Sequence, residues 1–173
     1  MKNFIKTLLS TVIGLVVLLL ILLTTYIFVN IQGVIDPLQI GNPNAKNKIL
    51  IASQGSEFKD NLLKNLVQSL ECEDNYLNIV DCTQLDNEKK PDWDAIVIIH
   101  SAQVHKMPKE AELFLERSED LSRVILVSTS GAGDDIIKNF EVDAISTASR
   151  ISITHKVINW LIPRIERKLL NNV

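Results

Sequence analysis

The sequence lacks most of the motifs that reveal an enzyme directly. It has 173 residues but only two cysteines and three histidines, and their spacing fits no standard zinc pattern. No G-x-S-x-G elbow marks a hydrolase serine. The turn from Thr129 to Gly133 has neither the P-loop lysine nor the glycine spacing of a dinucleotide site. Hydrolase, P-loop and structural-zinc signatures are therefore missing.

Charge is absent from residues 7–35, and Leu8 to Val29 is almost entirely apolar. At about 1.5 Å per residue this run spans about 33 Å, which is enough to cross the hydrocarbon core of a bilayer. It is longer than the apolar core of a secretory signal, and no small-residue cleavage site follows it. The sequence therefore predicts an uncleaved membrane anchor at residues 1–30.

The charges around this run predict its orientation. Lys2 and Lys6 precede the run, whereas Asp36 is the first charge after it. This bias predicts a single-pass protein of the cell membrane, with a cytoplasmic N-terminus and an extracytoplasmic domain. Residues 37–173 keep 16 basic and 20 acidic residues. Such a mildly acidic domain argues against nucleic acid as a partner and leaves an unknown protein partner as the expectation.

After the anchor, residues 31–47 show no sustained period and predict a linker. Residues 48–173 predict one α/β domain, because short apolar runs alternate there with amphipathic segments. The expected strands are Lys48–Ser53, Tyr76–Asp81, Asp94–His100, Arg123–Ser128 and Val142–Ser146. The expected helices are Glu57–Leu70, Lys109–Ser118, a short piece at 136–140, and Ile153–Leu170. We expect Pro163 to bend the last of these near residues 159–162.

This alternation favours a mainly parallel sheet with helices on both faces. Cys72 then ends a helix at the edge where strands begin, and Cys82 follows a strand at the opposite edge. An intramolecular disulfide is therefore not expected, since bridged Cα atoms lie within about 7 Å of each other. His100 and His105 share a loop near Cys82, but solvated or hydrogen-bonded histidines are the favoured interpretation over a metal site.

Several phrases of the sequence resemble the flavodoxin-like family. KILIASQGSEFKDNL is similar to its first strand, phosphate loop and first helix, and RVILVSTSGAGD to its fourth strand and the loop after it. DWDAIVIIHSAQVHKMPKEAELFLERS is similar to its third strand, loop and helix. The resemblance covers about residues 48–170. It implies a doubly wound, mainly parallel sheet of about five strands in the order 2-1-3-4-5.

The resemblance further implies a flavin mononucleotide (FMN) site for electron transfer at the carboxyl ends of the strands. The FMN phosphate would lie on the first loop and the flavin ring between the loops 100–107 and 129–134. The residues implied to bind FMN are Ser53, Gln54, Gly55, Ser56, His100, Ser101, Thr129, Ser130 and Gly131.

A second phrase also resembles a flavin motif. DAISTAS, residues 143–149, is similar to the sequence at which FMN is attached covalently, and the resemblance implies Ser149 as the acceptor. Thr147 stands where that motif has glycine. The alternative is a strand end followed by a polar turn.

The first loop also has an interpretation without FMN. It contains one glycine, displaced from the family position, and Glu57 would face the phosphate. Ser56 is equally explained as the N-cap of the following helix, with Glu57 complementing its dipole. Neither ring loop contains an aromatic residue. The rival hypothesis is a domain that has kept the fold, lost the ligand and acts as an interaction or scaffold module at the envelope.

Overall fold

A computed structural model describes residues 2–30, 32–89, 92–103, 106–118, 120–133 and 140–171. The chain divides into two compact units, Met1–Gln32 and Gly33–Val173. The first unit holds the helix α1 (Lys2–Asn30). Its stretch Phe4–Tyr26 has a mean hydropathy of 2.7, and none of it is buried. By length and composition α1 can cross a membrane, although an N-terminal signal sequence passes the same test.

The second unit is built on a six-stranded sheet in the order β1-β3-β2-β4-β5-β6. All neighbours are parallel except β1, which runs antiparallel to β3. The five predicted strands keep their predicted relative order, which is that of a flavodoxin-like sheet. The strands are β1 (Leu38–Ile40), β2 (Asn47–Ser53), β3 (Asn75–Asp81), β4 (Ala95–Ser101), β5 (Val124–Ser130) and β6 (Asp143–Ala148).

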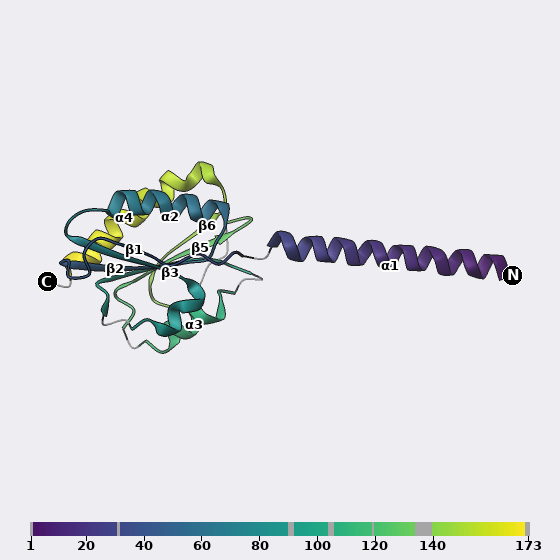
Figure 1. Cartoon of the computed structure of the whole chain (residues 1–173), viewed down its shortest axis with the longest axis horizontal. Coiled ribbons are helices and arrows are strands. Elements are labelled where there is room, and N and C mark those ends of the chain that lie inside the picture. Colours follow the sequence, from purple (N-terminus) through teal and green to yellow (C-terminus); the bar gives the residue numbers. More distant parts are fainter. Residues whose placement is uncertain are drawn as a thin grey trace. The chain divides into compact units, whose positions relative to one another are not determined.

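Helices cover both faces of the sheet, as the alternation predicted. On one face lie α2 (Glu57–Leu70) and α4 (Thr154–Leu170), which follows the short 3₁₀ turn η3 (Ile151–Ile153). On the other lie α3 (Lys109–Glu116) and the 3₁₀ helix η1 (Cys82–Asn87) (Figure 1). Because successive strand residues point to opposite faces, each central strand supplies both cores. The α2/α4 core takes Ile49 and Ile51 from β2, and the α3 core takes Leu50 and Ala52.

The sequence analysis missed β1, which lies within the predicted linker 31–47. Leu38 to Ile40 pair with Ile79 to Leu77, so this segment forms an edge of the sheet. Gly41 follows at a φ of +87°, which lets the chain turn back toward β2. A three-residue strand shows no period in a sequence, and the Gly, Pro and Asn around it are typical of linkers.

Pro163 does not divide α4, which stays helical from Thr154 to Leu170. The guanidinium of Arg164 donates to the carbonyl oxygen of Trp160 over 2.9 Å. Cys72 is exposed and Cys82 is buried, and no disulfide joins them, as the topology predicted. Of the short helical piece expected at 136–140, residues 136–139 lie outside the described residues.

We predict that Gly41→Ala destabilises the domain by roughly 1–3 kcal/mol, because alanine is strained at this positive φ. Its Cβ would also collide with the carbonyl oxygen of Asn75 on β3. Gly131→Ala is the matched control, since a Cβ there meets nothing within 4 Å. Denaturant midpoints of the two variants measure the difference. Equal midpoints would contradict the structure around β1.

Candidate functional site

Polar side chains replace the apolar ones where the parallel strands end. On the α2/α4 face this row consists of one residue from each of the five parallel strands. In strand register Ser101 lies beside Thr129, and Thr129 beside Thr147. All are at least nine-tenths buried, so the row is a buried polar layer at one end of the apolar core. In sheet order the row is Asp81, Ser53, Ser101, Thr129 and Thr147.

The ammonium of Lys59 lies at the centre of this row. Lys59 belongs to the first turns of α2, and only 1% of it is exposed. Its Nζ lies 2.7 Å from Oγ of Ser101 and 3.3 Å from Oγ of Ser56. Oγ of Ser101 lies 3.3 Å from Oγ1 of Thr129, so the hydroxyl row continues onto β5. Hydroxyl oxygens can accept from an ammonium, and they make its burial tolerable.

Burial lowers the pKa of Lys59 from 10.5 to about 8, against the opposing influence of Cys82 and Asp60. The side chain therefore remains mostly protonated at neutral pH and becomes a neutral amine in mildly alkaline solution. The sequence analysis did not single out Lys59. Its spacing from Leu62 and Leu66 places it on the apolar face of α2, which was the available signal.

The predicted phosphate loop, Ser53 to Ser56, uses its polar groups inside the protein. Oγ of Ser53 donates to the carbonyl oxygen of Gln54 over 3.0 Å. The Gln54 amide N–H donates to the carbonyl oxygen of Ile99 over 3.2 Å, and its side-chain Oε1 accepts from the amide N–H of Ser101 over 2.8 Å. Ser56 is the N-cap of α2, as the alternative interpretation predicted, and its hydroxyl accepts from the Lys59 amide N–H.

Gly55, the glycine of this loop, pairs with a residue outside the predicted domain. Its N–H donates to the carbonyl oxygen of Gly33 over 2.7 Å, and its carbonyl oxygen accepts from the Gly33 N–H over 2.9 Å. Two residues later the N–H of Ile35 donates to Oδ2 of Asp81 over 3.0 Å. The other oxygen of Asp81 accepts from the amide and the hydroxyl of Thr83. We call residues 33–35 the strap, since they cross the carboxyl ends of β2 and β3.

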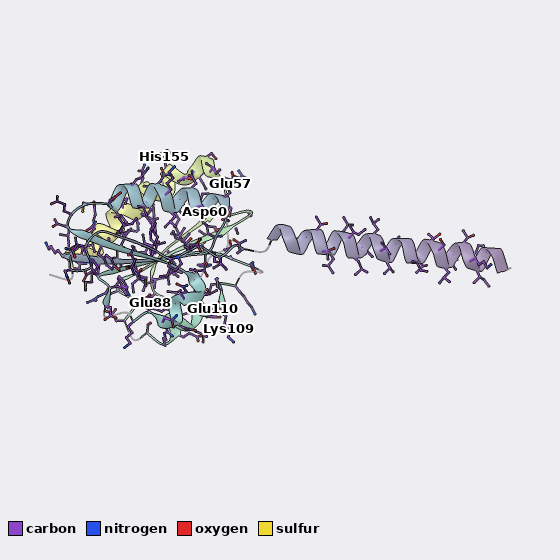
Figure 2. The ribbon with its side chains drawn as sticks, in the orientation of Figure 1. Glu57, Asp60, Glu88, Lys109, Glu110 and His155 are labelled. Carbon is purple, nitrogen blue, oxygen red and sulfur yellow. The ribbon has the colours of Figure 1, made fainter. Side chains whose placement is uncertain are left out.

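Carboxylates lie in the first turn of α2 and of α3, both of which begin near this edge. Glu57 and Asp60 lie in the first turn of α2, and Glu110 and Glu112 in that of α3. Figure 2 shows Glu57 and Asp60 on the α2 side of the sheet and Glu110 on the other side. These charges complement the helix dipoles, and they oppose the binding of a further anion at the same helix ends.

The side chains of His100 and Ser101 point to opposite faces of the sheet. The structure therefore does not place both of them beside the position implied for the flavin ring. His100 is fully buried on the α3 face beside Ser128 of β5. Neither ring nitrogen of His100 nor Oγ of Ser128 has a hydrogen-bond partner within the described chain. Burial lowers the pKa of His100 to about 4, and the charge of Lys59 acts in the same direction. His100 is therefore neutral at physiological pH.

The structure gives no support to a thiol or metal centre near Cys82. Burial, together with Asp81, raises the pKa of the Cys82 thiol to about 12, so the thiol stays protonated and unreactive. His105 lies outside the described residues. Among the residues that are described, no group of three or more His, Cys, Asp or Glu side chains is placed to hold a metal ion.

In the second loop predicted to contact the flavin ring, residues 129–134, the hydroxyls of Thr129 and Ser130 bond to backbone groups of the protein. Thr129 is fully buried, and its hydroxyl donates to the carbonyl oxygen of His100 over 3.1 Å. Oγ of Ser130 accepts from the N–H of Gly133 over 2.8 Å. Gly131 is exposed, with open space around its Cα. Asp134, at the end of this loop, lies outside the described residues.

The segment resembling a covalent flavin motif forms the edge strand β6. Thr147 is buried in the polar row, whereas Ser149 is exposed just beyond the strand. The Ser149 N–H donates to the carbonyl oxygen of Ser130 over 3.0 Å. The arrangement is that of the alternative interpretation, a strand end followed by a polar turn.

No protein-family model and no curated protein sequence matches this chain. Among solved structures, an oxidoreductase from Corynebacterium diphtheriae aligns with a TM-score of 0.49 and 9% identity, over 73% of this chain and 99% of that protein. A variant of a flavo di-iron protein from Thermotoga maritima aligns with a TM-score of 0.45 and 16% identity. That alignment covers 74% of this chain and 37% of the di-iron protein, so this chain spans little more than a third of its length.

These likenesses are too distant to carry an inference about function. The flavodoxin-like description of this domain rests on its own strand order.

We predict that the burial of Lys59 gives the domain a distinctive alkaline pH dependence. A group whose pKa is lower in the folded than in the unfolded state makes stability rise with pH between the two values. Wild-type stability should therefore rise relative to Lys59→Met as the pH increases above about 8. The exposed Lys64 on the same helix provides the control variant Lys64→Met. Parallel stability curves for wild type and Lys59→Met would contradict the burial of the ammonium.

Proposed function

We propose that this chain is a membrane-anchored protein whose flavodoxin-like domain acts without FMN, as an interaction or scaffold module at the cell envelope. The observation that carries the proposal is the pairing of Gly55 with Gly33, which closes the loop expected to bind phosphate. In the proposed topology α1 is the anchor, the N-terminus is cytoplasmic and the domain is extracytoplasmic. The apolar length of α1 and the two lysines before its core support this arrangement.

The residues of the closed loop do not fit an FMN phosphate. A phosphate at such a loop needs several backbone or hydroxyl donors directed toward it. Here the N–H of Gln54 and that of Gly55 both donate to carbonyl oxygens of the protein, and the hydroxyl of Ser56 caps α2. Glu57 adds a negative charge at the same helix end. Phosphate binding would therefore require the strap to leave Gly55.

The flavin ring would also find little to bind. Residues 100–107 and 129–134 contain no Phe, Tyr or Trp, so stacking on an aromatic side chain is unavailable. His100 and Thr129 are fully buried in the sheet and offer no side-chain surface to a ring. On the α2/α4 face of this edge, the hydroxyls of Ser101 and Thr129 instead bond within the protein.

One observation favours FMN-dependent electron transfer as the second candidate. The strand order places the first and third strands of the fold, β2 and β4, side by side at the centre, and doubly wound sheets bind ligands at that point. Ser56, Lys59 and Ser101 lie there and would face a ligand if the strap were displaced. Under this candidate Ser149 remains the proposed residue for covalent attachment.

A flavin titration of the purified full chain in detergent separates the two candidates. We expect colourless protein without the flavin absorbance band near about 450 nm, and unchanged fluorescence of added FMN. The reason is that the amides of Gln54 and Gly55 already donate within the protein. Saturable quenching of FMN fluorescence by the wild-type chain would contradict the proposal. Colour that survives denaturation in wild type but not in Ser149→Ala would establish the covalent form of the second candidate.

A further inference from the structure

The strap is held by few contacts. Its described hydrogen bonds are the two between Gly33 and Gly55 and the one from Ile35 to Asp81. Gly33 has no side chain, and Val34 is 74% exposed. Ile35 packs partly buried against the α2/α4 core. Segments with little buried apolar surface open more readily than the core of a domain, so the strap is a low-stability element over a well-packed sheet.

The close approach of the strap depends on glycine at position 55. A Cβ on Gly55 would lie 2.9 Å from the carbonyl carbon and 3.0 Å from the carbonyl oxygen of Gly33, which is closer than real Cβ contacts. A Cβ on Gly33 would lie 3.4 Å from the carbonyl oxygen of Gly55, which is an ordinary van der Waals contact, so the restriction lies at Gly55. Gly55 is itself buried although it lies in a turn at the sheet edge. The absence of a side chain at Gly55 is therefore what lets the strap approach the turn this closely.

The strap lies next to the partners of the buried ammonium. Gly55 directly precedes Ser56, whose hydroxyl lies 3.3 Å from Nζ of Lys59. Asp81, which accepts from the N–H of Ile35 in the strap, is the last residue of the same polar row and lies on β3. A lysine of which 1% is exposed, although it lies at the end of a sheet, needs a cover at that end.

We propose that residues 33–35 form a releasable strap that withholds the Lys59 amine from solvent and from ligands. When the strap leaves Gly55, the amide of Gly55 and the amine of Lys59 become accessible together. In the sequence α1 ends at Asn30 and the strap begins at Gly33. A force applied to α1 is therefore transmitted along the chain to the strap before it reaches the strands of the sheet. The inference goes beyond the proposed function, because it holds whether or not the domain binds FMN.

Amine-reactive labelling of the full chain in detergent at about pH 8, read by mass spectrometry, tests this proposal. In wild type we expect Lys59 to react roughly ten-fold or more slowly than the exposed Lys64 on the same helix. Two variants should bring Lys59 close to the rate of Lys64. Gly55→Ala pushes the strap away, and Gly33→Pro removes the N–H that donates to Gly55. Gly131→Ala, at the same sheet edge but with open space around it, should behave as wild type.

An internal control separates strap release from unfolding. Nζ of Lys168 lies 2.6 Å from Oδ2 of Asp143, at the opposite end of β6, and it should keep its wild-type rate in every folded variant. If the labelling of Lys59 and of Lys168 accelerates together in a variant, that variant has unfolded. The labelling rate of Lys59 in the other strap variant then tests the proposal. The proposal is overturned if wild-type Lys59 reacts as fast as Lys64. It is also overturned if Lys59 stays slow in a folded variant whose strap contact is broken.

Discussion

The two hydrogen bonds between Gly33 and Gly55 join the segment after α1 to the turn that follows the central strand β2. They occupy donor and acceptor groups that an empty turn would present to solvent or to an anion. They also lead the chain to Asp81 and into the edge strand β1. The turn after β2, at the edge where a doubly wound sheet usually binds its ligand, is thereby occupied by the protein's own backbone.

The burial of Lys59 near this turn depends on hydroxyl groups. An ammonium transferred from water into an apolar core is strongly destabilising unless it is hydrogen-bonded. Ser56 and Ser101 supply oxygens at 3.3 and 2.7 Å, and Thr129 extends the row. The opposite face has no comparable arrangement around His100, which is accommodated as a neutral side chain. The two faces of one sheet edge therefore differ in charge, although their residues alternate along the same strands.

The five parallel strands and the long helices could be predicted from the sequence, because apolar runs and helix periodicity are local signals. The strand order was implied by the resemblance to the flavodoxin-like family, and the N-cap at Ser56 by its residue type. The sequence was insufficient for the strap and β1. Gly33 and Gly55 are far apart in sequence, and nothing in either neighbourhood indicates that they pair. The placement of side chains at the site was hard to predict for a related reason. His100 and Ser101 are adjacent, and a shift of one residue along a strand moves a side chain to the other face.

The central claim is that Gly55 is sealed by the strap, and hydrogen exchange of the Gly55 amide measures this most directly. In ¹⁵N-labelled full-length protein the account predicts an amide protected well beyond its unfolded rate. In Gly33→Pro this protection should fall, while that of the core strands β2 and β4 is retained. A Gly55 amide that exchanges in wild type at the rate of an exposed turn would contradict the account.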